Sequence, residues 1–149
     1  MKKHILLVED NPDDADLSVT ALKEHARDVE VTVVEDGVEA LEYLTCTGQH
    51  EGRPATLPDV VLLDLKLPKM DGHEVLKAVR AHPRTKHLPV VILTSSVEEQ
   101  DLTSSYELGV NSYVQKPVNF DDFSRVAERL GEYWLGLNHV APSIRRRDP

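Results

Sequence analysis

Five short apolar runs along the chain alternate with stretches in which apolar residues recur every three or four positions. β-Branched residues, which favour strands, are frequent in the runs, which occupy residues 4–8, 31–35, 60–64, 89–94 and 112–115. The stretches that follow each run predict helices at 13–26, 37–46, 72–81, 97–108 and 119–138. This alternation predicts an α/β domain with a parallel sheet that helices cover on both faces.

Two segments fall outside this alternation. Residues 47–58 are rich in glycine, proline and polar residues, and we expect them to form a surface loop between the second helix and the third strand. Residues 139–149 follow the last helix, and we expect a flexible C-terminal tail there. The predicted domain therefore covers residues 3–138, with no internal repeat and no second domain.

The charge and the cysteine content narrow the function. The chain of 149 residues has a formal net charge of −9, which disfavours non-specific binding to nucleic acid, and we expect the arginines at 145–147 to be solvated. No apolar run approaches the roughly 18 residues of a membrane span, and the first run turns acidic too early for a signal peptide. The single cysteine, Cys46, excludes an internal disulfide and is typical of the cytoplasm.

Chemically active side chains gather where the predicted strands end, which is where open parallel sheets bind their ligands. They are Glu9, Asp10, Asp64, Thr94 and Lys116. If the first and third strands are neighbours, the three carboxylates converge, and two like charges about 4 Å apart repel by roughly 4 kcal/mol at an effective dielectric near 20. A Mg²⁺ ion and the charge of Lys116 would offset this repulsion. An aspartate beside Mg²⁺, a lysine and a hydroxyl is equipped to accept a phosphoryl group.

Four motifs together resemble the receiver domain of two-component response regulators. They are ILLVEDN (5–11), VVLLDLKLPKMDG (60–72), VVILTSS (90–96) and SYVQKP (112–117). The resemblance implies a chemotaxis-regulator-like fold, a doubly wound, flavodoxin-like (βα)5 sheet with strand order 2-1-3-4-5. The stretch VEDNPDDADL (8–17), the long loop and the extended last helix are similar to a narrower group, the single-domain regulators of phytochrome-type histidine kinases.

The resemblance implies a role for each residue at the strand ends. Asp64 would be the phosphoacceptor. Asp10 and Asp64 would bind Mg²⁺ through their carboxylates, Lys66 through its backbone carbonyl, and Glu9 through a water molecule. The side chain of Lys66 would hang over the mouth of the site.

The same resemblance implies a conformational switch. Thr94 would donate its hydroxyl to one phosphoryl oxygen and Lys116 would pair with another, with a cis peptide bond before Pro117 placing the lysine. Thr94 would move towards the new oxygens, Tyr113 would turn inward, and the face made by the fourth helix, the fifth strand and the fifth helix would be remodelled.

The expected partners follow from this interpretation. A sensor histidine kinase would supply the phosphoryl group, and output would pass to another protein, including a histidine phosphotransfer protein. The chain would act as a phosphoacceptor, with self-catalysed transfer and autodephosphorylation, and not as an enzyme. The apolar stripe of the last helix continues past a compact core, so we expect a homodimer interface at Tyr133, Trp134, Leu135 and Leu137.

Three alternatives share parts of this pattern. Each strand-end residue taken singly has a structural explanation, such as an acid that caps the next helix, which is the role we expect for Asp71. A phosphatase of the haloacid-dehalogenase type would need an acid where this chain has Lys66, and a flavodoxin would need a phosphate-binding loop where it has EDNPDD. A receiver-like module that never takes phosphate would lack some of the site residues, all of which are present.

Overall fold

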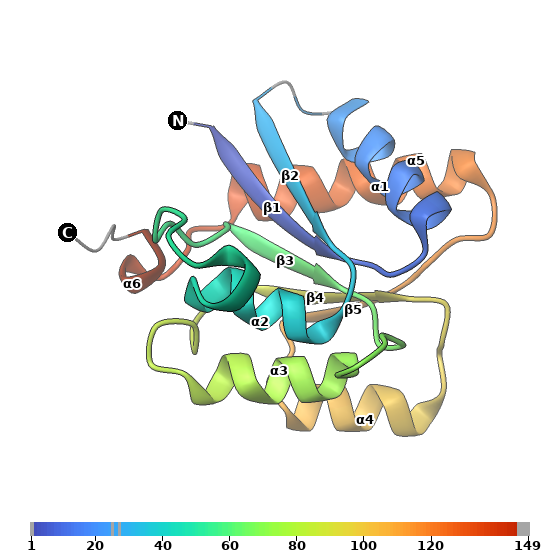
Figure 1. Ribbon diagram of the computed structural model, residues 1–149. Helices are drawn as coiled ribbons and strands as arrows, with labels where there is room; N and C mark the ends of the chain where they lie inside the picture. Colours follow the sequence, from blue (N-terminus) through green and yellow to red (C-terminus); the bar gives the residue numbers. More distant parts are fainter. Residues whose placement is uncertain (1, 25, 27, 146–149) are drawn as a thin grey trace.

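Five strands form a single sheet in the computed structural model, which describes residues 2–24, 26 and 28–145 (Figure 1). The order is β2-β1-β3-β4-β5, and every neighbouring pair is parallel, which confirms the predicted topology. The strands are β1 (Lys3–Val8), β2 (Val29–Val34), β3 (Val60–Leu63), β4 (Val90–Thr94) and β5 (Ser112–Gln115). Every residue of β3 and β4 is buried, as the continuous apolar runs predict for central parallel strands.

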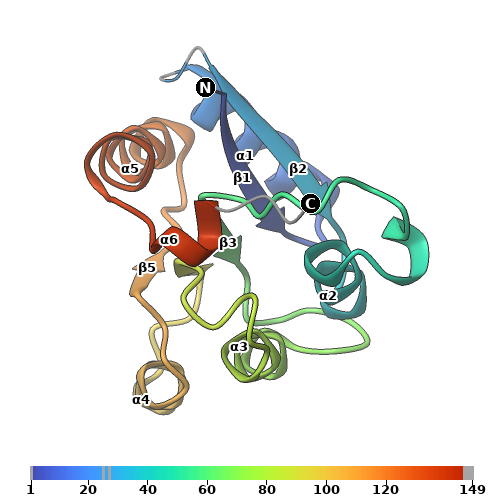
Figure 2. The same cartoon turned by 90° about the vertical axis from the view of Figure 1, so that its left-hand side faces the viewer.

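Helices cover both faces of the sheet, as Figure 2 shows in a view in which α3, α4 and α5 are seen end-on. One face packs against α1 (Pro12–Glu24) and α5 (Phe120–Gly131), and the other against α2 (Gly37–Thr45), α3 (Gly72–Ala81) and α4 (Glu99–Glu107). Two apolar cores result, one on each side of the sheet. Short helical turns add η1 (Gly48–His50), η2 (Glu132–Leu137) and α6 (Pro142–Arg145).

Three helices begin at a residue whose side chain caps them. Asp36, Asp71 and Asn119 each accept a hydrogen bond from the backbone N–H three residues on, at the starts of α2, α3 and α5. The side chain of Glu74 accepts a hydrogen bond from the backbone N–H of Asp71, which completes a capping box. The expected capping role of Asp71 is therefore confirmed.

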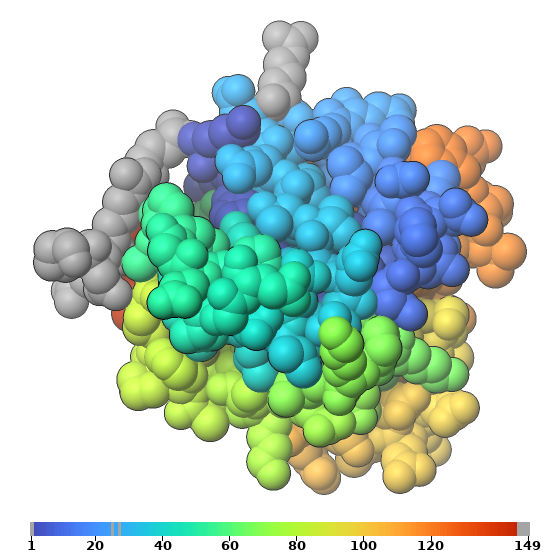
Figure 3. All heavy atoms as spheres, in the orientation of Figure 1, coloured from blue at the N-terminus to red at the C-terminus, as the bar shows by residue number. Residues whose placement is uncertain are grey.

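The segment between α2 and β3 is more ordered than the expected surface loop. It contains η1, and it forms part of the surface beside α2 in Figure 3. The guanidinium of Arg53 lies 3.7 Å from the centre of the Tyr43 ring and donates to the Tyr43 carbonyl through Nε at 2.7 Å. Leu57 and Pro58 are buried. The loop is thus attached to α2 by a stacked arginine and to the core by its last residues.

The C-terminal segment differs from the flexible tail that we expected from residue 139. After α5 the chain continues through η2 and then crosses to the other side of the sheet, where α6 lies near the start of β3 (Figure 2). Ile144 is 4% exposed in the core beneath α2 and α3, and Val140 and Ala141 pack against the same core. These apolar side chains cover the core at the amino ends of the strands, so burial holds the segment down. Residues 146–149 lie outside the described residues.

No helix among the described residues combines the length and the apolar content that crossing a membrane requires.

Candidate functional site

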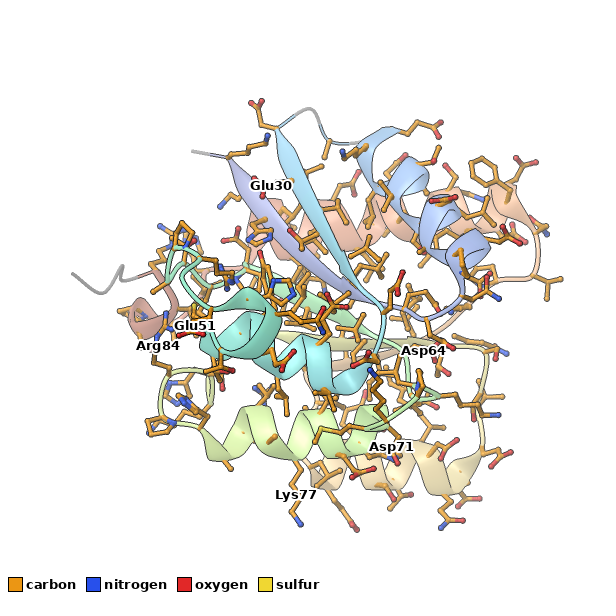
Figure 4. All side chains as sticks on the ribbon, in the orientation of Figure 1. Glu30, Glu51, Asp64, Asp71, Lys77 and Arg84 are labelled. Atoms are coloured by element: carbon orange, nitrogen blue, oxygen red, sulfur yellow. The ribbon has the colours of Figure 1, made fainter. Side chains whose placement is uncertain are left out.

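The predicted site residues meet at the carboxyl ends of the central strands. The backbone N–H of Asp64 donates to the carbonyl of Val8 at 3.2 Å, so the residues after β1 and β3 lie side by side. Figure 4 shows Asp64 beyond the end of β3, at the edge of the sheet opposite to Glu30, which lies at the start of β2. The short apolar strand therefore carries the carboxylate through the core to the surface.

Three carboxylates form a cluster with the chemistry of a divalent-cation site. Oxygen atoms of Glu9, Asp10 and Asp64 all lie within 4.8 Å of one another. Asp10 is exposed, while Glu9 is only 3% exposed, and this burial raises the pKa of Glu9 in opposition to the nearby Lys116 ammonium. Hard oxygen donors at this spacing fit Mg²⁺ or Mn²⁺, and an ion would relieve the repulsion among the acids.

Lys116 supplies the fixed positive charge of the site. Its Nζ donates to Asp64 Oδ2 at 3.0 Å and to Glu9 Oε1, and it lies 3.5 Å from Asp14 Oδ2. Burial alone would lower the pKa of Lys116, but the contacts with Glu9 and Asp64 outweigh it and raise that pKa. The lysine therefore stays charged and holds the acids together.

The expected cis peptide bond before Pro117 is wrong, because no peptide bond among the described residues is cis. The preference of an X–Pro bond for trans is only about 0.5–1 kcal/mol, so the resemblance alone could not decide the isomer. With the trans bond, Lys116 still reaches its three carboxylates.

The loop after β3 folds back tightly under Asp64. Gly72 donates its N–H to the Leu65 carbonyl at 2.8 Å, and a Cβ at Gly72 would lie 2.4 Å from the carbonyl oxygen of Asp64. Any larger side chain would push the loop and Asp64 apart. The backbone N–H of Lys66 donates to Asp64 Oδ1 at 3.3 Å, and the Lys66 side chain is exposed. The loop thus fixes one oxygen of Asp64 while Lys116 fixes the other.

The expected switch residues are joined through a third residue. Thr94, the last residue of β4, is 1% exposed, and its Oγ1 accepts the N–H of Ser96 at 3.4 Å. The hydroxyl of Tyr113 donates to the Ser96 carbonyl at 2.9 Å. Burial raises the pKa of Tyr113, so its phenol stays protonated and can donate at neutral pH.

Sequence reasoning missed two residues of this neighbourhood. Asp14 lies in the first turn of α1, where an acid suits the helix dipole, and it also lies against Lys116. Ser96 gave no signal of its own, although its position two residues after Thr94 could have drawn attention. Both belong to loops or helix starts whose direction the strand pattern does not fix.

The four expected interface residues divide into two pairs. Tyr133 and Leu137 in η2 are 49% and 69% exposed, whereas Trp134 and Leu135 pack against the core between the sheet and α1 and α5. The rings of Tyr133 and Trp134 meet edge to face, 4.8 Å apart. Of the four residues, Tyr133 and Leu137 therefore offer the most surface to another protein, and Trp134 and Leu135 are partly buried.

Comparison with known proteins agrees with this geometry. The family model of the response regulator receiver domain matches residues 5–128. The chain belongs to this family. The match includes most of β1, the other four strands and every strand-end residue described above.

Two curated relatives cover nearly the whole receiver domain and resemble it along most of their own lengths. The chain is 46% identical to a probable methanogenesis regulatory protein, FilR2, from Methanothrix harundinacea, over 90% of this chain and 84% of the relative. It is 41% identical to the response regulator Rcp1 from Synechocystis, over 89% of each chain.

Solved structures place the domain near the phytochrome response regulators. The phosphorylated cyanobacterial phytochrome response regulator RcpA matches with a TM-score of 0.88 and 40% identity, over 94% of this chain and 99% of that one. The Mn²⁺-bound form of Rcp1 matches with a TM-score of 0.85 and 40% identity, over 93% and 99%. The bacteriophytochrome response regulator AtBRR is 54% identical, with a TM-score of 0.75 over 93% and 99%.

Proposed function

We propose that this protein is a stand-alone response regulator that accepts a phosphoryl group on Asp64 from a sensor histidine kinase. The observation that carries the proposal is the pairing of Asp64 with Lys116 at the carboxyl edge of a receiver sheet, beside two further acids. The chain also spans 84% and 89% of two curated relatives, one of them a response regulator. The proposed reaction takes place in the cytoplasm.

In the proposed reaction, an Asp64 carboxylate oxygen attacks the phosphorus atom of the donor. A P–O bond to aspartate forms while the bond from phosphorus to the donor breaks, and the electron pair leaves with the donor, an imidazole or an acetate. Lys116 pairs with one phosphoryl oxygen, and the hydroxyl of Thr94 donates to another. Because phosphoryl transfer needs mainly positioning and charge neutralisation, the reaction requires no protein base.

A Mg²⁺ ion held by Asp10 and Asp64, by the Lys66 carbonyl and, through water, by Glu9 would supply further neutralisation of phosphoryl charge. The acid cluster and the Mn²⁺-bound structure of the similar protein Rcp1 support a divalent cation here. Removal of divalent cations with EDTA should therefore prevent phosphorylation of the folded protein.

The proposed output is a change in the face formed by α4, β5 and α5. The phosphoryl group carries about −1.5 to −2 charges in place of the single carboxylate charge of Asp64, which draws Thr94 and frees Tyr113 to reposition. A downstream protein, or a histidine phosphotransfer protein that takes the phosphoryl group onward, would read this face. The similarity to RcpA and AtBRR supports a phytochrome-type kinase as the donor.

The decisive test is incubation with acetyl phosphate and Mg²⁺ followed by intact-mass measurement. We expect wild-type protein to gain the mass of one phosphoryl group and Asp64→Asn to gain none. Asp71→Asn is a matched control, because Asp71 caps α3 on the same loop and should leave the gain intact. No gain in wild type would indicate a receiver-like module that never takes phosphate, and a gain in Asp64→Asn would place the phosphoryl group elsewhere.

We also propose that the exposed apolar residues of η2 contribute to a homodimer. Leu137 and Tyr133 both expose a large part of their side chains, whereas Trp134 is partly buried and packs against the core. Leu137→Ser should raise the dimer dissociation constant, measured by sedimentation velocity, about threefold, the effect of losing about 0.7 kcal/mol of apolar burial. Leu17→Ser, at an exposed position on α1, is the control. A dimer fraction unchanged by Leu137→Ser would exclude this surface.

A further inference from the structure

Ser96 lies at a junction between the switch residues and α4. Its N–H donates to Thr94 Oγ1 at 3.4 Å, and its carbonyl accepts the hydroxyl of Tyr113 at 2.9 Å. Its own hydroxyl donates to Asp101 Oδ2 at 2.7 Å and accepts the N–H of Glu98 at 3.2 Å. Every polar group of this one residue is therefore occupied, and the contacts reach β4, β5 and α4.

The hydroxyl of Ser96 provides hydrogen bonds at the start of α4, where the capping residue itself provides none. Glu98 occupies the capping position of α4, but its side chain makes no capping hydrogen bond. In an ordinary capping box, the side chain at the third helical position accepts the N–H of the capping residue directly. Here Asp101 holds that third position and reaches the Glu98 N–H only through the Ser96 hydroxyl. The first turn of α4 is therefore completed by a residue that lies outside the helix.

The apolar contacts of α4 are too few to fix its position alone. Ser105 is the one residue of α4 that is buried, and its hydroxyl donates to the Asp101 carbonyl at 2.6 Å. Because that hydroxyl has a single proton, the Nε2 of His73 on α3 must be the donor in the His73–Ser105 hydrogen bond of 2.9 Å. Polar contacts at Ser96 and Ser105 thus hold a helix that has little apolar anchoring, so a small shift at either can move it.

We propose that Ser96 is the positioning residue through which Thr94 and Tyr113 control the start of α4. The proposal deepens the proposed function and rests on it, because it concerns the route from phosphorylated Asp64 to the output face. A displacement of Thr94 towards a phosphoryl group moves the backbone of Ser96, and the Ser96 hydroxyl carries that displacement to Glu98 and Asp101. Tyr113 acts on the same residue from β5, so the two switch residues share one connection to α4.

Hydrogen exchange measured by mass spectrometry tests this connection in the full chain. In unphosphorylated protein, Ser96→Ala should speed exchange about fivefold at the first bonded amides of α4, including Leu102, which donates to Glu98. Ser96→Thr keeps the hydroxyl and should restore most of the protection. Ser95→Ala, at the exposed neighbouring position, is the matched control and should exchange like wild type.

The coupling itself is measured with acetyl phosphate and Mg²⁺, with phosphoryl uptake determined by intact mass on each sample. Wild type should show a change in α4 exchange on phosphorylation, and Ser96→Ala should take up the phosphoryl group yet lose most of that change. A change of wild-type size in phosphorylated Ser96→Ala overturns the role of Ser96 and leaves the proposed function intact. No uptake by wild type overturns the proposed function and the coupling with it.

A double-mutant comparison tests whether Ser96 and Asp101 act through their shared hydrogen bond or independently. Asp101→Ala removes the acceptor of the Ser96 hydroxyl, so Ser96→Ala/Asp101→Ala should exchange no faster at Leu102 than either single variant. Additive acceleration in the double variant would show that the two side chains act independently, which overturns the relay.

Discussion

At the scale of the residue, the site is organised around one ammonium group and its acids. Lys116 contacts carboxylate oxygens of Glu9, Asp14 and Asp64. Glu9 and Asp64 are nearly buried, whereas the side chain of Asp14 is 47% exposed. Asp14 therefore adds negative charge at the mouth of the site without a structural need for it.

Asp14→Asn should speed phosphorylation by acetyl phosphate about threefold, because it removes one charge that repels the anionic donor. A charge about 7 Å from the donor contributes about 0.6 kcal/mol in a solvent-like dielectric. The initial rate of phosphoryl uptake at low ionic strength measures the effect, and added salt should diminish it. Asp16→Asn removes an equal, exposed charge further along α1 and is the control. A rate for Asp14→Asn no faster than for Asp16→Asn would exclude this role.

At the scale of the element, the C-terminal segment shows how a short apolar sequence acquires structure from its surroundings. Val140, Ala141 and Ile144 are too few to establish a strand or helix period, and α6 has only four residues. Isolated helices of that length are unstable in water, so packing against the core must hold the turn in place. The segment closes the core at the amino ends of the strands.

Ile144→Ala should lower the free energy of unfolding by about 2 kcal/mol, at the low end for a buried isoleucine because a terminal segment can relax into the space. Urea denaturation followed by circular dichroism measures the change, and Ser143→Ala, at an exposed neighbour, should leave the stability within about 0.5 kcal/mol. Equal stabilities for the two variants would mean that the segment does not contribute to the core.

At the scale of the whole molecule, the end of the sheet opposite to the site carries a partly buried polar cluster. His4 Nε2 lies 3.0 Å from both Thr32 Oγ1 and the hydroxyl of Tyr43. Burial lowers the pKa of His4 below its ordinary value of 6.5, and Arg53 lowers it further, whereas Glu30 and Asp59 oppose the shift. The folded protein thus holds this histidine in its neutral form.

The stability should consequently fall as the pH decreases below about 6.5, because the unfolded chain then binds a proton that folded His4 resists. The stability from neutral His4 is fully present above that pH and is lost between it and the lower folded-state pKa. Urea denaturation at a series of pH values should show a weaker decline in His4→Gln. His87→Gln, at an exposed histidine, should keep the wild-type decline. If the stability of His4→Gln declined with pH as steeply as that of wild type, other groups would cause the decline.

Much of this molecule follows from local sequence. The run Val60–Leu63 is wholly apolar and is followed by a charged residue, so it can only be a central strand that ends at the surface on Asp64. Asp36, Asp71 and Asn119 mark helix starts for equally local reasons. The convergence of Glu9, Asp10 and Asp64 also followed, once β1 and β3 were taken as neighbours.

Other features depend on groups that meet only in the folded chain. Asp14 and Lys116 are 102 positions apart in the sequence, and no local pattern near either residue predicts their contact. Ser96 caps α4 because the loop after β4 turns its hydroxyl into the helix, and Ile144 is buried because the chain crosses the sheet edge. The isomer of the peptide bond before Pro117 could likewise not be predicted from the sequence.

The sequence by itself determined the elements and the strand-end acids, since periodicity and capping act over a few residues. Tertiary structure decided which charges pair and which helix start is capped from outside, since these depend on how distant segments pack.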